Sequence, residues 1–138
     1  MASQNKHIPK PQPVFETQPF QSAEETWFWF IAAQEARNDG ARFVAGKGLA
    51  IRPCEPLDIL RVVDRLYRQR RLMRDHLLVL RYYGRRHMPP DRRRIKEMRA
   101  HKIWSEAMER MQVAFERKGI VVLADPKSWL DNEGRVAR

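Results

Sequence analysis

Apolar residues recur at helical spacing through most of the central chain, and this period constrains the fold more than any other feature. The clearest stripe comprises Ile59, Val62, Val63 and Leu66, and it follows Pro56, a favoured first-turn helix residue. A stripe of this kind indicates a helix that turns one face toward a core. Since 138 residues suffice for one domain, we expect a mainly α protein built as a small helical domain.

An earlier helix is predicted to begin at Ser22. Ser22 and Glu25 match the S-x-x-E capping box directly before an apolar run, and Gly40 is the expected stop. Apolar residues surround the first turns, which contain Trp27 and Trp29. This pattern favours burial in the core, and the alternative is a docking surface for another protein.

A third helix is predicted over residues 75–83, with Gly84 as its end. Its centre is a continuous apolar run, so we expect it to lie in the middle of the fold. A basic link containing two prolines follows it.

The phase of the apolar residues predicts a break in the last helical region. Asp91 is the expected cap, and Ile95 lies nine residues before Trp104, which would put them on opposite sides of one straight helix. A turn at residues 99–102 would let both face one core, and Gly119 would end the second helix. The residues expected to be largely buried are Trp27, Ile59, Leu66, Leu78, Leu80, Ile95, Trp104 and Met111.

The chain divides into an arm, a domain and a tail. Residues 1–21 contain four prolines and predict a flexible arm, residues 22–124 a single helical domain, and residues 125–138 a loosely held tail. A β-hairpin is compatible with residues 42–52, and a strand at residues 120–123 could extend it to three strands.

Positive charge is concentrated in one segment of a chain whose net charge is +10. Residues 61–102 hold 15 of the 27 Lys and Arg residues and only 4 of the 17 acidic residues. Most of these bases are Arg, whose guanidinium forms paired hydrogen bonds to phosphates. This surplus favours a polyanionic partner.

Catalytic and metal-binding patterns are missing from the sequence. Cys54 is the single cysteine, no Cys/His ligand spacing occurs, and His76 in an apolar helix is interpreted as a packed or capping residue. We expect no enzyme, no metal and no cofactor. The N-terminus lacks signal-peptide character, and no apolar run approaches the roughly 20 residues of a membrane helix. The expectation is a cytoplasmic protein without a membrane partner.

The segment after residue 71 resembles region 4 of sigma-70 factors. The L…L-x-L-R-Y-x-G pattern of that family is matched by Leu72, Leu78, Leu80, Arg81, Tyr82, Tyr83 and Gly84. Ile95 stands where the family's next helix carries an apolar anchor, and a recognition helix would start near Lys102. The resemblance covers residues 57–118, with the helix-turn-helix-like part at residues 75–118. It implies DNA binding in transcription regulation, as in phage late-transcription activators and antiterminators, with RNA polymerase as a further partner.

The charges on the last helix favour phosphate contacts over base reading. Glu106 and Glu109 share its outer face with Lys102, and carboxylates there repel phosphates. Either this helix or the segment with Trp27 and Trp29 could instead contact a protein. An RNA or ribonucleoprotein binder and a protein-interaction module therefore remain alternatives to a DNA-binding regulator. The predicted nucleic-acid-binding residues are Arg85, Arg86, Arg92, Arg93, Arg94, Lys96, Arg99, Lys102 and Ser105.

Overall fold

Four α-helices account for most of residues 17–40 and 51–123, the part of the chain that this computed structural model describes. They are α2 (Ala23–Asn38), α3 (Pro56–Arg68), α4 (Arg74–Arg85) and α5 (Met98–Arg117), with a short 3₁₀ helix, η1 (Ile95–Glu97), before α5. No strand occurs in these ranges, so the mainly α fold is confirmed. Most of the predicted hairpin, most of the arm and the tail lie outside the described residues.

The start of α2 confirms Ser22 as the helix cap, but the return hydrogen bond of the predicted capping box goes to Gln21, one residue before the cap. The Ser22 hydroxyl accepts a hydrogen bond from the Glu25 backbone N–H at 3.1 Å, and the Glu25 carboxylate accepts one from the Gln21 N–H at 2.9 Å. The helix ends at Asn38, and Gly40 follows with φ 77°, a left-handed conformation that favours glycine.

α3 begins at Pro56, as its sequence predicts. The Asp58 carboxylate accepts a hydrogen bond from the Glu55 backbone N–H at 2.8 Å, which closes the first turn. The apolar stripe faces the core, and its buried members are Ile59, Val62, Val63 and Leu66.

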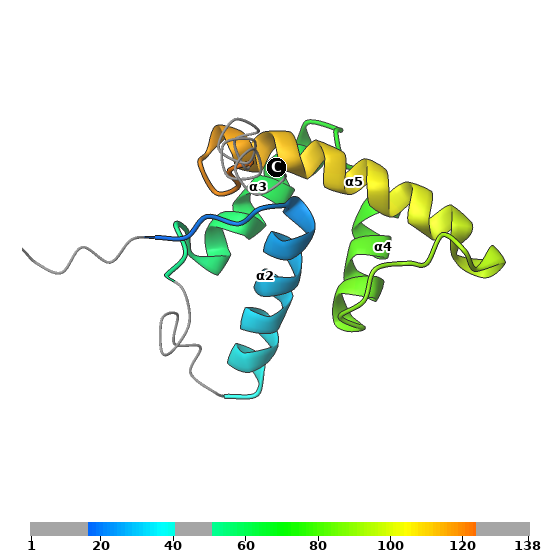
Figure 1. The fold of residues 1–138 in the computed structure, drawn as a ribbon, viewed down its shortest axis with the longest axis horizontal. Coiled ribbons are helices and arrows are strands. Elements are labelled where there is room, and N and C mark those ends of the chain that lie inside the picture. The colour runs from blue at the N-terminus through cyan, green and yellow to red at the C-terminus, as the bar shows by residue number, and fades with distance from the viewer. Residues whose placement is uncertain (1–16, 41–50, 124–138) are drawn as a thin grey trace, which may run out of the picture.

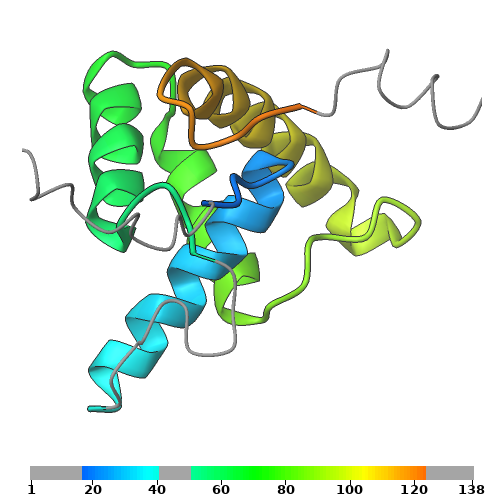
Figure 2. The ribbon, with the colours of Figure 1, turned by 60° about the vertical axis from the view of Figure 1, so that its left-hand side comes forward.

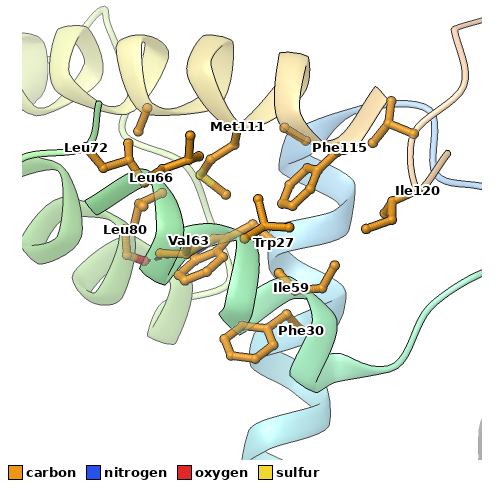
Figure 3. Close-up of a cluster of buried hydrophobic side chains, with 14 of the residues drawn as sticks. Trp27, Phe30, Ile59, Val63, Leu66, Leu72, Leu80, Met111, Phe115 and Ile120 are labelled. Carbon is orange, nitrogen blue, oxygen red and sulfur yellow. Dashed lines mark hydrogen bonds between the residues drawn. The ribbon is translucent and has the colours of Figure 1, made fainter. Parts of the chain in front are cut away.

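α5 packs on the other three α-helices and covers one side of the core (Figure 1). Met111 and Phe115 reach from α5 into a cluster that also contains Leu66 and Leu80 (Figure 3). Because each helix contributes a stripe to this cluster, the apolar period sets most of the core. Predicted burial is confirmed for Trp27, Ile59, Leu66, Leu80, Trp104 and Met111.

The segment before α2 pairs with the segment after α5 (Figure 2). Phe20 and Val121 form a parallel bridge, in which the Phe20 N–H donates to the Ile120 carbonyl at 2.9 Å. The predicted strand after α5 is therefore a single bridge within the described residues, and its partner is this segment. Phe20 is fully buried, so it anchors the last residues of the predicted arm to the helical body.

The connection between α4 and α5 differs from the prediction. Asp91 starts no α-helix, and α5 runs unbroken from Met98 through residues 99–102, where a turn was predicted. The predicted turn requires that Ile95 and Trp104 both face the core, and this premise is wrong; the helical region does break, but before Met98. Ile95 is 86% exposed instead of buried, because it belongs to a 3₁₀ turn outside the phase of α5.

α4 also differs from the prediction at two residues. It continues through Gly84 to Arg85, and Gly84 is buried against Trp27 and Ile31 instead of ending the helix. Leu78 is 53% exposed, although it was predicted to be buried. Four consecutive apolar residues at about 100° each cannot all face one side of a helix, so one of them points outward.

Candidate nucleic-acid interface

Two carboxylates hold residues 91–97, here called the basic loop, in a defined shape. Asp91 Oδ1 accepts the Arg93 backbone N–H at 2.9 Å, and Glu97 Oε1 accepts the Asp91 N–H at 3.3 Å. The Arg94 guanidinium lies between them, 4.0 Å from Asp91 Oδ2 and 3.7 Å from Glu97 Oε2. The loop is therefore ordered by its own side chains.

These contacts divide the bases of the loop into two kinds. Arg94 lies within ion-pair distance of two carboxylates, which offset its charge. Arg92, Arg93 and Lys96 are exposed, and no acidic side chain in the described ranges lies within 4.0 Å of their charged groups. These three cations are free to bind an external anion.

Arg99 and Lys102 extend the basic surface onto the first turns of α5. They line a hollow of about 400 Å³ at the start of α4 together with Asp75, His76 and Glu106. Because acids share this hollow, its charge is mixed, and it attracts phosphate less strongly than the basic loop does.

Arg85, Arg86 and Ser105 lie on other parts of the surface. The Arg86 guanidinium lies 5.5 Å from the centre of the Tyr82 ring and donates to the Tyr82 hydroxyl at 3.3 Å. Arg85 lines an apolar groove of about 450 Å³ between α2, α3 and α4, and Arg81 lies in the same groove. Ser105 lines a hollow of about 520 Å³ between α2 and α5. The predicted residues are therefore spread over several faces.

Trp27 belongs to the core, which is the interpretation that the sequence favours over the docking alternative. It is 6% exposed, and its indole N–H donates to a backbone carbonyl of α4 at 3.0 Å. The half-buried Trp29 packs on Phe20, with ring centres 5.2 Å apart. Glu106 is engaged within the chain, whereas Glu109 is exposed on the outer face of α5.

His76 connects the start of α4 to α5, which confirms its interpretation as a capping residue. Its Nδ1 accepts the Met73 backbone N–H at 2.9 Å, so the ring proton lies on Nε2, 3.1 Å from Glu106 Oε1. This hydrogen bond, helped by the positive charge of Arg110 and opposed by burial, holds the pKa of Glu106 below its ordinary value. Both ring nitrogens have structural partners, so His76 is not placed for catalysis.

Glu97 is the residue of the candidate interface that the sequence did not single out. Its side chain is 17% exposed, and it contacts the backbone of Asp91 and the side chain of Arg94. Burial, followed by the charge and hydrogen bond of Glu97, raises the pKa of Tyr83. The available signal was the spacing of three residues between Asp91, Arg94 and Glu97, which also occurs in helices.

Neither a metal centre nor a reactive thiol is found in residues 17–40 and 51–123. No three His, Cys, Asp or Glu side chains in these ranges are grouped so that they could hold a metal. Burial raises the pKa of the Cys54 thiol to about 11, with the charges of Asp58 and Glu55 acting in the same direction. A thiol that stays protonated at neutral pH is a poor nucleophile. The helices of this part of the chain lack the length and apolar character needed to cross a bilayer.

Comparisons with protein-family models, curated proteins and solved structures return no match. The residues and their geometry therefore carry the functional argument alone.

Proposed function

We propose that this protein binds nucleic acid, prefers duplex DNA, and acts as a DNA-binding transcription-type regulator without enzymatic activity. The observation that carries the proposal is the state of Arg92, Arg93 and Lys96. These bases are exposed and have no acidic partner in the described ranges, and Asp91 and Glu97 fix the loop that carries them.

Phosphate binding follows from the chemistry of these groups. A guanidinium offers paired donors that match two phosphate oxygens, and the ammonium of Lys96 adds a point charge. Since the loop is already ordered, less conformational entropy is lost on binding. The net charge of +10 adds long-range attraction to any polyanion.

The outer face of α5 supports contact with the DNA backbone more than extensive base reading. By the resemblance to sigma-70 region 4, α5 corresponds to the recognition helix, which would enter the major groove. Glu106 and Glu109 disfavour close approach to phosphates, so we assign sequence preference to Lys102 and Ser105 alone. The exposed Glu109 is then available to a protein such as RNA polymerase. We propose a cytoplasmic location, where the single thiol of Cys54 stays reduced.

The experiment is a titration of labelled duplex DNA at several salt concentrations. Replacing Arg92 and Arg93 with Ala should weaken binding to all sequences and make the log-log salt slope shallower by about 2, because two phosphate contacts are lost. The matched control removes two charges from α3, at Arg61 and Arg68, each of which already pairs with a carboxylate. It should keep the slope.

Three outcomes would contradict the proposal. The wild type could show no duplex binding at low salt, or both double variants could lose affinity equally. Equal or tighter binding to structured RNA would replace DNA by RNA as the partner.

A further inference from the structure

Ile95 has the largest exposed fraction of any large apolar side chain in the described ranges. It lies at the first position of η1, and Met98, three residues further on, is 55% exposed. Residues three apart lie on the same side of a 3₁₀ turn, so the two side chains form one apolar tip.

Contacts within the basic loop keep Ile95 and Met98 exposed to solvent. Asp91 and Glu97 brace the loop on both sides of Ile95, Arg94 links the two carboxylates, and Pro90 is buried at the base. An apolar side chain gains free energy by leaving water, and an unbraced loop could fold back over the core. The brace prevents that collapse, which leaves Ile95 available to a partner.

Exposed cations flank the apolar tip along the chain. Arg92, Arg93 and Lys96 are exposed near Ile95 in the chain and lack acidic partners in the described ranges, and Arg99 follows as the second residue of α5. A complementary partner has anionic groups outside and an apolar interior within reach of a short side chain. Duplex DNA fits this description, because phosphates border the stacked faces of its base pairs.

We propose that Ile95, supported by Met98, inserts between adjacent base pairs of duplex DNA from the minor groove and bends the helix. Apolar wedges flanked by Arg and Lys act in this way in minor-groove proteins. The inference rests on the proposed DNA binding. It adds a mechanism, which is insertion with bending, and a preference for certain base-pair steps. Pyrimidine–purine steps such as TA unstack most easily, so the wedge selects them over stiff A-tracts.

The test uses two duplexes, one with a central TA step and one with an A-tract. Each carries a fluorescent donor and acceptor at its ends, and 2-aminopurine beside the central step. Wild-type protein should raise energy transfer and 2-aminopurine emission on the TA duplex, which report bending and unstacking. Ile95→Ala should lose both signals and bind the TA duplex about tenfold more weakly, with the salt slope of the wild type.

Two control variants separate the wedge from a general apolar effect. Ile95→Leu should keep both the energy-transfer signal and the 2-aminopurine signal of the wild type. Leu57→Ala, which trims an exposed leucine of α3, should leave them unchanged.

The outcomes distinguish a failure of the wedge from a failure of the proposed DNA binding. Absence of duplex binding by the wild type would end both. Binding without bending or unstacking, or equal signals from Ile95→Ala, would overturn the wedge and leave DNA binding in place. Association with vesicles of phosphatidylserine and phosphatidylcholine that depends on Ile95, without bending of DNA, would replace the wedge by a membrane contact.

Discussion

The core beneath α5 and the basic loop are both well-defined structures, but different forces shape them. In the core, Met111 and Phe115 are buried because they fall on the inward face of a continuous helix. In the loop, Asp91 and Glu97 determine the backbone path, and Ile95 lies outside any α-helical face. Apolar spacing therefore predicts burial only for a residue whose helix has been placed correctly.

The largest expected effect compares one apolar residue from each region. Phe115→Ala should lower the free energy of unfolding by about 3–5 kcal/mol, because it opens a cavity beneath α5. Ile95→Ala should change it by less than about 0.5 kcal/mol, because the side chain is already in water. Urea denaturation followed by circular dichroism measures both, and similar losses would show that Ile95 packs in solution.

Gly84→Ala should produce an intermediate loss. An added Cβ would lie 2.9 Å from the Trp27 indole nitrogen and 3.0 Å from Ile31 Cγ1. Such overpacking costs about 1–3 kcal/mol and outweighs the helix propensity of up to about 1 kcal/mol that alanine gains over glycine. The net expectation is a destabilisation of up to about 2 kcal/mol in the same denaturation assay. A more stable variant would mean that Trp27 and Ile31 move aside at little cost.

Gly84 also illustrates what the sequence could not determine. A glycine near the end of an apolar run can stop a helix or admit a neighbouring side chain, and only the position of α2 distinguishes the two. The helix around Ile59 and Leu66 was predictable, because Pro56 and the apolar stripe agree there. The stripe through Met111 predicted the body of α5 but not its start. The basic residues of the candidate site were predictable as a class. Their division into the braced Arg94 and its free neighbours was not, because it depends on side-chain contacts.

Weakening the loop brace should have a smaller and local effect. Glu97→Gln removes the charge that Arg94 faces and weakens acceptance of the Asp91 N–H. A hydrogen bond to a charged group contributes about 1.5–3 kcal/mol, and solvent access reduces this to about 1 kcal/mol here. Amide hydrogen exchange should accelerate in residues 91–97 while the centre of α5 stays protected.

The exposed Glu116 near the end of α5 provides the matched control. Glu116→Gln should leave exchange in the basic loop unchanged. Identical exchange in the loop of Glu97→Gln and wild type would mean that the carboxylate brace does not order it.

The smallest expected effect concerns pH and the contact between α4 and α5. The hydrogen bond from His76 holds the pKa of Glu106 below its ordinary value. A carboxyl group whose pKa is depressed by folding adds stability above its unfolded pKa of about 4.3, and this contribution is lost as pH falls through the folded pKa. Glu106→Gln should therefore lower stability at neutral pH and flatten the decline between neutral pH and acid. Thermal unfolding at a series of pH values measures this difference. Parallel curves for variant and wild type would show that the pair does not couple folding to pH. A variant that loses more stability in acid than at neutrality would reverse the expected sign.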